Sequence, residues 1–261
     1  MAYEHLTAQR TGSVERLTLN RPEVRNAFNE AMLEELTVWA KETAGDPGVR
    51  AVVLSGAGPV FCAGADAAWM AKTVEKTQAE NVADARFAAE MFRAINELPV
   101  PVIARIQGAA IGGGAGLAAV SDVVVADEHA MFAFTEVKLG IIPAVISPFV
   151  LAKIGPSAAR ELFLTGRRCT AQHALDIGLV HTLVPIDDLD AGVDAVLREV
   201  LSAGPEAIAA AKRLIAQVAF LGAEDAASVT SAALAERRVS VEGQEGLRAF
   251  LQKRKPGWNI A

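Results

Sequence analysis

Two glycine-rich segments are the first features of this chain whose residue types and spacing could do chemistry. The longer one, residues 108–116, reads GAAIGGGAG, and the shorter one, residues 61–66, reads FCAGAD. Glycine lets a ligand approach the main chain closely, and the helical run 115–120 after Gly112–Gly114 should leave their N–H groups free. Such donors could hold an oxyanion. Composition alone favours a plainer alternative, in which the glycines only permit a tight loop or close helix–strand contact.

The glycines do not form a nucleotide-binding motif. The dinucleotide fingerprint needs a third glycine where Leu117 stands, and no Gly-Lys-Ser or Gly-Lys-Thr of a phosphate-binding loop occurs. Gly56 and Gly58 follow a predicted strand, but Pro59 comes next, which makes this turn a poor dinucleotide site. The remaining chemical interpretation of these glycine-rich segments is that they expose main-chain N–H donors to a ligand.

Glu136 is the main candidate for acid–base chemistry. It follows MFAFT at 131–135 and precedes VKLGIIP at 137–143, so its surroundings are largely apolar. A carboxyl group in apolar surroundings tends to have a raised pKa, which suits proton transfer near neutral pH. In the alternative, Glu136 simply points to solvent from the end of a strand, as most glutamates do.

The sequence indicates no metal site and no clear nucleophile. The chain has four histidines, His5, His129, His173 and His181. They form no His-Glu-x-x-His motif or close cluster of metal ligands. No Gly-x-Ser-x-Gly segment occurs, which leaves an esterase-type serine unsupported. Cys62 could act as a nucleophile, although such a cysteine is more often a small buried apolar residue.

Composition excludes several classes of function. Apolar residues make up 52% of the 261 residues, enough for a sizeable core, and the net charge of −6 gives a general nucleic-acid-binding role no support. With two cysteines, no apolar N-terminal segment and no apolar run of about 18 residues, we expect a cytoplasmic protein without a membrane span. The one dense basic cluster, residues 248–256, either binds phosphates or is a solvated helix end.

Strands that alternate with helices predict an α/β core with crossover connections. The predicted strands span 14–19, 49–54, 102–106, 123–126 and 131–134. Asn26 or Asn29 can cap a helix that Gly45 ends, and a second helix is expected over 78–98. The last third is mostly helical, with helices opened by Pro156 and Thr170, a strand near 180–184, and helices over 187–202, 205–221 and 224–241.

Taken together, these segments resemble the crotonase (enoyl-CoA hydratase/isomerase) family. The likeness covers nearly the whole chain, from LTLNRP at 17–22 to FLQKRKPGW at 250–258. Its most specific parts are FCAGAD at 61–66, Gly112–Gly114 and TEVKLGIIP at 135–143. Each part is weak alone, but their order and spacing make the chain clearly similar to that family.

The resemblance implies an α/β fold, a crotonase-like spiral of ββα units followed by a C-terminal helical trimerisation region. On this basis we expect a core with the CoA-thioester site over residues 1–195 and an oligomerisation region over residues 196–261, in a homotrimer or homohexamer. The implied substrate is an acyl-CoA. Because CoA is then part of the substrate, no separate cofactor, metal or nucleic-acid partner is expected.

The resemblance also assigns site residues. The thioester oxygen should lie between the main-chain N–H groups of Ala65 and Gly113, and Glu136 should be the acid–base group. The substrate-binding positions carried over are Arg25, Ala27, Ala63, Ala65, Asp66, Ala67, Ala68, Gly113, Phe250 and Lys253. The adenine end of CoA should follow the turn 63–66 with Arg25 near the phosphates. The last two positions should approach the ligand of a neighbouring subunit.

One departure bears on the reaction. Typical hydratases of the family place a glutamate three residues after the oxyanion glycine, where this chain has Gly116, and a second where it has Glu136. Several isomerases of the family also keep only the later glutamate, since one base can move a proton between carbons. Segments 65–70 and 136–148 nevertheless resemble bacterial hydratases of the methylglutaconyl-CoA type. We therefore place an enoyl-CoA hydratase ahead of a Δ3-Δ2-enoyl-CoA isomerase, with a non-catalytic CoA-thioester-binding or RNA-binding relative as a third hypothesis.

Overall fold

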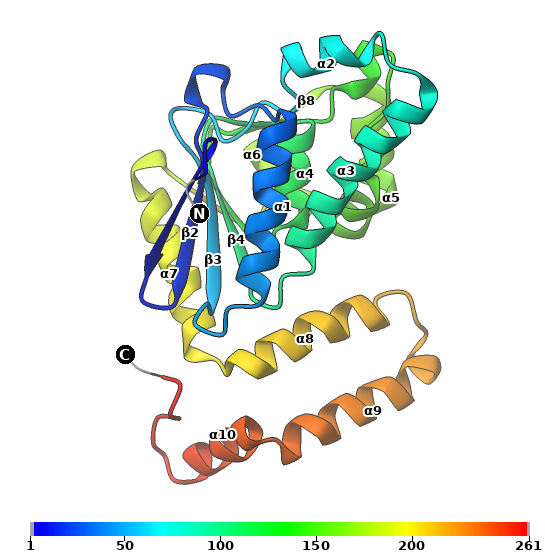
Figure 1. Cartoon of the computed structure of the whole chain (residues 1–261). Coiled ribbons are helices and arrows are strands. Elements are labelled where there is room, and N and C mark those ends of the chain that lie inside the picture. Colours follow the sequence, from blue (N-terminus) through cyan, green and yellow to red (C-terminus); the bar gives the residue numbers. More distant parts are fainter. Residues whose placement is uncertain (1–2, 260–261) are drawn as a thin grey trace.

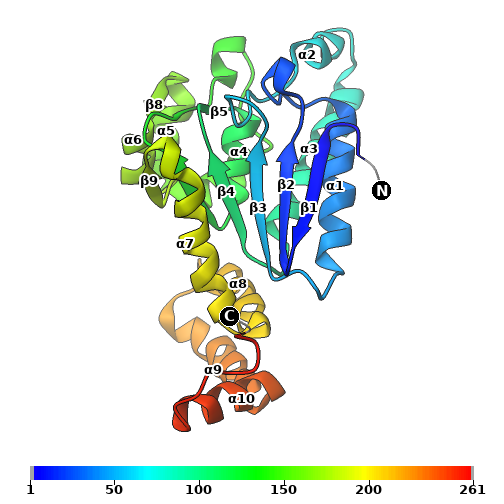
Figure 2. The same cartoon turned by 90° about the vertical axis from the view of Figure 1, so that its left-hand side faces the viewer.

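The computed structural model describes residues 3–259, and its centre is a mostly parallel sheet with helices on both faces (Figures 1 and 2). The strand order is β1-β2-β3-β4-β6-β9. The strands are β1 (Leu6–Thr11), β2 (Val14–Leu19), β3 (Ala51–Gly56), β4 (Val102–Ile106), β6 (Val123–Asp127) and β9 (Thr182–Val184). β1 is antiparallel to β2, and the remaining pairs are parallel. The predicted α/β core with crossovers is confirmed.

A second, three-stranded sheet explains the spiral. It has the order β5-β7-β8, formed by β5 (Ala109–Ile111), β7 (Met131–Ala133) and β8 (Arg168–Thr170). β4 leads into β5 and then α4 (Gly113–Val120), and β6 leads into β7 and then α5 (Ser147–Thr165). Two successive units of strand, short strand and helix therefore repeat. This arrangement confirms the expected ββα units. Because β5 pairs with β7, the start of α4 lies beside the segment that follows β7.

The helices on one face of the sheet begin where their sequences predict. α1 (Glu30–Ala44) is capped by Asn29, whose side-chain oxygen accepts a hydrogen bond of 2.8 Å from the Met32 N–H. α3 (Gln78–Asn96) starts with a capping box formed by Thr77 and Glu80. Met32, Leu33, Leu36 and Trp39 of α1 are all buried, because their helical spacing puts them on the side that faces the sheet.

The opposite face is covered by α7 (Leu189–Ser202), as Figure 2 shows. Val193 and Leu197 of this helix form a second apolar cluster with Val53, Ile103 and Val125 of the sheet. Strands β3, β4 and β6 are thus buried on both faces. That burial accounts for their continuous apolar sequences, since parallel strands covered by helices show no polar alternation.

Several elements differ from the sequence-based expectation. β1, β5, β8 and the short helix α2 (Ala67–Thr73) were not predicted. α5 begins at Ser147, before Pro156, and is bent at Gly155, where φ is 71°. Pro156 opens the second segment of this helix, and Gly166 ends it as predicted. Thr170 caps α6 (Ala171–Asp176) by accepting a hydrogen bond from the His173 N–H.

Three helices at the C-terminal end extend away from the sheet (Figure 1). They are α8 (Pro205–Val218), α9 (Ala223–Val239) and α10 (Val241–Leu251). Within α8 and α9 no residue is buried, and Phe220, Val241 and Phe250 are 87%, 88% and 80% exposed. Exposed apolar surface of this extent marks an interaction surface. Its use for trimer formation stays a prediction.

Asn26 is the polar residue that joins two loops near the top of the sheet. It does not cap α1 but lies fully buried with φ at 57°. Its side-chain oxygen accepts a hydrogen bond of 2.9 Å from the Arg21 N–H, and its Nδ2 group lies within 2.8–3.1 Å of the carbonyl oxygens of Ala57, Val60 and Phe61. The turn before Phe28 is thereby fixed against the loop after β3.

Replacing Asn26 should test this link. Asn26→Ala leaves the buried N–H and carbonyl partners without hydrogen bonds, and each such group costs about 1–3 kcal/mol. We expect the free energy of unfolding in urea to fall by about 2–4 kcal/mol. Asn20→Ala, at an exposed asparagine next to the same turn, should change it by less than about 0.5 kcal/mol. Equal effects of the two changes would contradict the role of Asn26.

Candidate active site

Ala65 and Gly113 line one cavity, and the main-chain N–H groups of both have no main-chain acceptor among the described residues. Phe28 N–H donates to the Gly64 carbonyl at 2.7 Å and Asp66 N–H donates to the Phe28 carbonyl at 2.8 Å, so the Ala65 N–H between them is left free. Gly113 is the first residue of α4, and within residues 3–259 its N–H also has no main-chain acceptor, as expected in the first helical turn. The predicted pair of donors is thus brought together.

Glycine is required where these two segments meet. Gly112, just before α4, has φ at 53°, a conformation that favours glycine. A Cβ atom on Gly113 would lie 2.7 Å from Cε2 of Phe28, and one on Gly64 would lie 2.7 Å from the carbonyl oxygen of Ile111. The glycines therefore permit close packing between these segments, and the same segments carry main-chain donors without acceptors. Both interpretations of the glycine run, close packing and exposed donors, fit this geometry.

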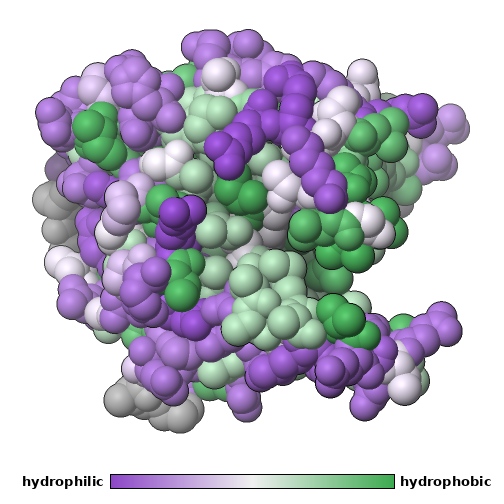
Figure 3. Space-filling view, turned by 90° about the horizontal axis from the view of Figure 1, so that it is seen from above, coloured by the Kyte–Doolittle hydropathy of each residue, from purple (hydrophilic) through white to green (hydrophobic). Residues whose placement is uncertain are grey.

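The cavity has a volume of about 160 Å³ and mostly apolar walls. Its lining residues are Phe28, Leu33, Ala65, Trp69, Ala88, Phe92, Gly113, Glu136, Ile142, Pro143, Ala144, Val145 and Ile146. They come from α1, α2 and the loops just before these two helices, from α3, from the start of α4 and from the segment after β7. Apolar and hydrophilic side chains alternate in patches around this upper end of the molecule (Figure 3).

Glu136 is the one acidic side chain in this wall. It opens a short 3-10 helix, Glu136–Leu139, that Gly140 ends with φ at 74°. Its Oε1 atom lies 3.1 Å from the place that a Cβ on Gly112 would take, and its Oε2 atom is buried without a hydrogen-bond partner. Burial raises the pKa of this carboxyl above its usual range. The expectation of an acid–base group in apolar surroundings fits this geometry, and a carboxylate directed to bulk solvent does not.

A larger groove of about 550 Å³ leads away from the cavity and shares Ala65 with it. Its lining residues are Glu23, Val24, Arg25, Ala27, Ala63, Ala65, Asp66, Ala67 and Ala68. The groove thus brings together the predicted substrate-binding positions of the N-terminal third of the chain. An extended ligand could enter along the groove and place its end in the cavity.

Asp66 in this groove is held by protein groups. Although burial alone would raise the pKa of its carboxyl, hydrogen bonds from the N–H groups of Ala68 and Trp69 and the ion pair with Arg21 lower it. The Asp66–Arg21 distance is 3.0 Å. This carboxylate therefore caps α2 and fixes the groove wall. Its side chain is occupied by these partners, which leaves its main chain for contact with a ligand.

Phe250 and Lys253 are not near this groove. Phe250 belongs to α10 and Lys253 comes shortly after this helix, which lies at the opposite end of the molecule from α2 (Figure 1). Lys253 has φ at 55°, and Phe250 is almost fully exposed. Within one chain, these two predicted binding positions therefore lie far from the others. Their contact with the ligand of a neighbouring subunit stays a prediction.

The space above Gly116 is filled by apolar side chains. A Cβ atom on Gly116 would lie 2.4 Å from Cγ2 of Ile146 and 3.0 Å from Cε1 of Phe92. Both neighbours are only 3% exposed. A carboxylate at this position would need Ile146 to move. The site is therefore built for one carboxylate, that of Glu136.

Sequence reasoning missed Trp69, Phe92 and Ile146 as cavity walls. Trp69 follows the predicted turn by three residues, and Ile146 comes ten residues after Glu136. These positions in the sequence gave little indication that the two side chains line the cavity. Phe92 was expected on the apolar face of a helix. The helical pattern did not indicate that its ring also contacts the ring of Phe28 edge-on, with ring centres 6.3 Å apart.

The other candidates from the sequence are structural. Cys62 is fully buried, and burial raises the pKa of its thiol to about 12, so it is wrong as a nucleophile. His181 accepts a hydrogen bond of 2.9 Å from the Val124 N–H through Nδ1. In residues 3–259 no group of three or more potential metal ligands comes together, and no described helix is long and apolar enough to cross a membrane.

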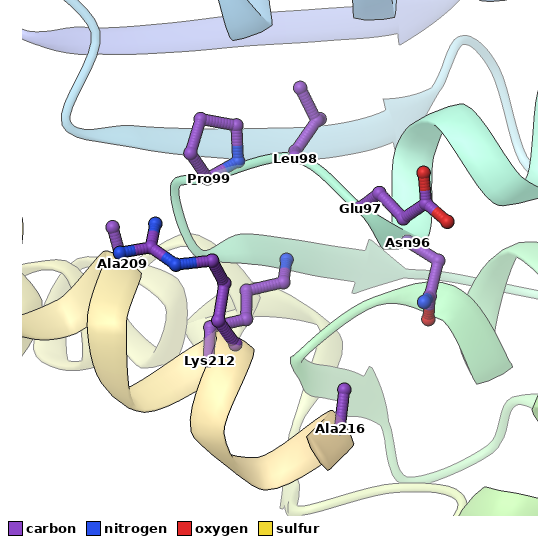
Figure 4. Close-up of a pocket in the computed structure, with 8 residues that line it drawn as sticks. Asn96, Glu97, Leu98, Pro99, Ala209, Lys212 and Ala216 are labelled. Atoms are coloured by element: carbon purple, nitrogen blue, oxygen red, sulfur yellow. The ribbon is translucent and has the colours of Figure 1, made fainter. Parts of the chain in front are cut away.

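A further cavity of about 270 Å³ lies between the end of α3 and α8 (Figure 4). Its lysine, Lys212, pairs with Asp122 at 2.6 Å and also approaches the Val100 carbonyl. This cavity contains none of the predicted site residues. Lys212 thereby attaches α8 to the core.

Comparison with known proteins agrees with this geometry. The profile of the family described as "Enoyl-CoA hydratase/isomerase" matches residues 9–260. A "Putative enoyl-CoA hydratase" of Thermus thermophilus is 36% identical over 94% of this chain and 97% of its own length. A "Probable enoyl-CoA hydratase echA8" of Mycobacterium tuberculosis is 35% identical over 98% of both chains.

Solved structures give the same result. An enoyl-CoA hydratase from Shewanella pealeana superposes with a TM-score of 0.94 at 38% identity, covering 98% of this chain and 96% of that one. A crotonase-type putative enoyl-CoA hydratase/isomerase from Legionella pneumophila superposes with a TM-score of 0.92 at 40% identity, covering 98% and 99%. The chain is therefore a member of the enoyl-CoA hydratase/isomerase (crotonase) family.

Proposed function

We propose that this enzyme is an enoyl-CoA hydratase, which adds water across the 2,3 double bond of an enoyl thioester. The observation that carries the proposal is the single cavity that holds the buried carboxylate of Glu136 and the free N–H groups of Ala65 and Gly113. The names of the relatives, in which hydratase is frequent, also support it. The CoA is supplied by the substrate, and no further cofactor is needed.

The two N–H groups account for activation of the thioester. The carbonyl oxygen would accept hydrogen bonds from Ala65 and Gly113, and the negative charge of the enolate would develop on that oxygen. Fixed donors at the place where charge develops stabilise the transition state more than the ground state. The start of α4 adds the favourable end of its helix dipole.

Glu136 would carry the proton chemistry. In the hydration direction its carboxylate takes a proton from water while the hydroxyl adds to C3, and the resulting carboxylic acid then gives a proton to C2 of the enolate. The atoms of one water molecule are thereby added, and Glu136 returns to its starting state. Its raised pKa brings it closer to neutral pH, where a group can both accept and release a proton efficiently.

The groove beside the cavity would hold the CoA portion. The main chain of the turn 63–66 offers a wall for the adenine end, and Arg25 offers a cation for the phosphates. Arg25 has φ at 56°, a left-handed conformation that is uncommon for residues other than glycine. A binding role would explain why that conformation is kept.

A Δ3-Δ2-enoyl-CoA isomerase is the second candidate, because the space at Gly116 is closed to a second carboxylate. One carboxylate can move a proton between C2 and C4 through a dienolate held by the same donors. Hydration stays our first choice, with a branched and carboxylated enoyl-CoA such as methylglutaconyl-CoA as substrate, because segments 65–70 and 136–148 resemble hydratases of that type. A non-catalytic CoA- or RNA-binding protein would leave the buried carboxylate of Glu136 without a purpose.

The assembly we propose is a homotrimer or a homohexamer. The exposed apolar residues of α8–α10 need a partner surface, and a second copy of the chain would bring Phe250 and Lys253 to a groove that their own chain leaves without them. The dense basic tail would then meet the phosphates of a neighbour's ligand.

The reaction can be tested at Glu136. Glu136→Gln keeps the shape of the side chain but removes the base, so hydration should fall by about 10²–10⁴ while CoA-ester binding changes little. Thioester absorbance measures turnover, and mass spectrometry after reaction in ¹⁸O-water should find the label at C3 of the product. Conversion of a 3-enoyl-CoA to a 2-enoyl-CoA without label would favour the isomerase, and full activity of Glu136→Gln would overturn both.

The same substitution should stabilise the fold at neutral pH. A carboxyl whose pKa is raised by burial is harder to ionise in the folded chain, so its contribution disfavours folding above its unfolded pKa of about 4.3. We expect Glu136→Gln to raise Tm at pH 7 by about 1–3 °C and to lose this effect below about pH 4. Glu34→Gln, at an exposed glutamate of α1, is the control and should show no such pH-dependent gain. A lower Tm for Glu136→Gln at pH 7 would contradict the burial argument.

The shared site can be tested through Lys253. Light scattering should give a mass that is a multiple of three chains. If Lys253 reaches the CoA of a neighbour, Lys253→Ala should weaken CoA binding about 3- to 10-fold by calorimetry, the size of one lost charge-assisted hydrogen bond. Lys41→Ala, an exposed lysine on α1, is the control. A stable monomer with full CoA affinity would refute the shared-site arrangement.

A further inference from the structure

Lys253 occupies the position after α10 at which many helices end on glycine. The Lys253 N–H donates to the Phe250 carbonyl at 3.1 Å, and the Arg254 N–H donates to the Ala249 carbonyl at 3.0 Å. These two bonds form a Schellman motif, which requires a left-handed residue at the position of Lys253, and its φ is 55°. Because a side chain costs free energy in that conformation, glycine would suit the turn better. The lysine therefore calls for an explanation outside the turn.

The other cation expected at the CoA phosphates shares this conformation. In residues 3–259, the residues other than glycine that have a positive φ are Arg25, Asn26 and Lys253. The hydrogen bonds of its buried amide account for Asn26. Arg25 and Lys253 are the two cations that the proposed function assigns to one ligand, from a subunit and from its neighbour. Uncommon backbone conformations are kept preferentially where a ligand is bound.

A bidentate ion pair holds the chain directly after Lys253. The carboxylate of Glu245 in α10 accepts hydrogen bonds from Nη1 and Nη2 of Arg254 at 2.6 and 2.9 Å. It accepts a third, of 3.1 Å, from the Gly257 N–H. The hydrogen bonds with Arg254 lower the pKa of Glu245 to about 2, so the pair stays charged near neutral pH. Two parallel bonds fix the direction of the chain as well as its distance from α10.

The end of this tail is also attached to the core. Nη1 of Arg50 donates to the Trp258 carbonyl at 2.9 Å, and Nε1 of Trp258 donates to the Ser202 carbonyl at 3.1 Å. A Cβ atom on Gly246 would lie 2.9 Å from Cη2 of Trp258, so the indole packs directly on α10. The chain on the C-terminal side of Lys253 is thus fixed both to α10 and to the core.

The ammonium group of Lys253 takes no part in these contacts. The residue is exposed, and no acidic side chain within residues 3–259 pairs with it. Arg254, next to it, is neutralised by Glu245. The turn therefore combines a fixed main chain with one cation that can meet an anion. Binding then has to order only the lysine side chain and not the turn, which favours affinity.

We propose that Glu245 is a positioning residue for CoA binding. By holding Arg254 and the Gly257 N–H, it fixes the turn from which the ammonium group of Lys253 reaches the phosphates of a CoA ester bound by the neighbouring subunit. The inference rests on the proposed function, because it takes Lys253 as part of a shared site. Glu245 itself touches no phosphate, and its charge alone would repel one.

Removing the charge of Glu245 separates positioning from plain electrostatics. Glu245→Gln takes a negative charge out of the basic tail, so electrostatics alone would strengthen phosphate binding. Loss of the bidentate pair should weaken it instead, and we expect the Kd of CoA, measured by calorimetry, to rise about 3- to 5-fold. In turnover of methylglutaconyl-CoA the change should appear in KM and not in kcat. Tighter or unchanged CoA binding would overturn the role of Glu245.

Asp46→Asn is the matched control. Asp46 pairs with Arg10 at 2.7 Å and accepts a hydrogen bond of 2.8 Å from the Gly48 N–H, so it also holds one arginine and one glycine, but it lies in the turn after α1. This variant should leave the Kd of CoA unchanged. A rise equal to that of Glu245→Gln would reflect a general effect of lost ion pairs and would refute the assignment.

Coupling with Lys253 distinguishes failure of this inference from failure of the shared site. If Glu245 acts through Lys253, adding Glu245→Gln to Lys253→Ala should leave the Kd at the value of Lys253→Ala alone, whereas independent effects multiply. Multiplied effects would refute positioning while the shared site stands. No effect of Lys253→Ala on CoA binding would refute both.

Light scattering and the choice of ligand complete the test. Glu245→Gln should keep the mass of the wild-type assembly, and a smaller mass would make Glu245 an assembly residue and overturn the positioning role. CoA binding is measured without turnover, so the outcome at Glu245 is decided even if the hydratase reaction is wrong.

Discussion

The buried amide of Asn26 is the interaction on which the geometry of the site depends most. It fixes the turn before Phe28 to the loop after β3 through one accepted and several donated hydrogen bonds. Phe28 then bridges to Ala65 through its main chain, while its ring lies against Gly113. This amide therefore helps to position both candidate oxyanion donors, together with the main-chain bridge between Cys62 and Ala110 that joins their segments directly. A fully satisfied polar group is suited to this, because hydrogen bonds specify direction where apolar contacts do not.

The features that could be predicted from the sequence are those with a local pattern. Apolar runs showed the central strands, and Asn29 with Gly45 bounded α1. The glycine run and Glu136 were recognisable because their neighbours in the chain define their chemistry. Asn26 was taken for a possible helix cap, because its real partners at 57–61 lie thirty residues away. The buried Nε1 atom of Trp69, which has no hydrogen-bond partner, had no local signature either, since an absent partner shows only in the folded chain.

In the glycine-rich segments, close packing of the main chain and access to its N–H donors both depend on glycine. A Cβ on Gly114 would lie 2.4 Å from the carbonyl oxygen of Cys62, and one on Gly116 would meet Ile146. Neither glycine lines the candidate cavity. Gly114 lets the start of α4 lie against the loop that carries Ala65, and Gly116 lets this helix lie against Ile146 and Phe92. The donor of Gly113 is useful only because its neighbours permit that approach. The two interpretations of the glycine run were therefore never exclusive.

The closed space at Gly116 also changes the electrostatics of Glu136. A second carboxylate nearby would raise the pKa of the first by repulsion, whereas here burial is the leading cause of the rise. In the proposed reaction the fixed N–H donors would point at the thioester oxygen, so a negative charge would be favoured there more than on the desolvated glutamate. Charge should thus move from the glutamate to the enolate as a proton is taken up. Ile146, an apolar residue, fills the place where a side chain on residue 116 would stand, so it keeps a second carboxylate away from the acid.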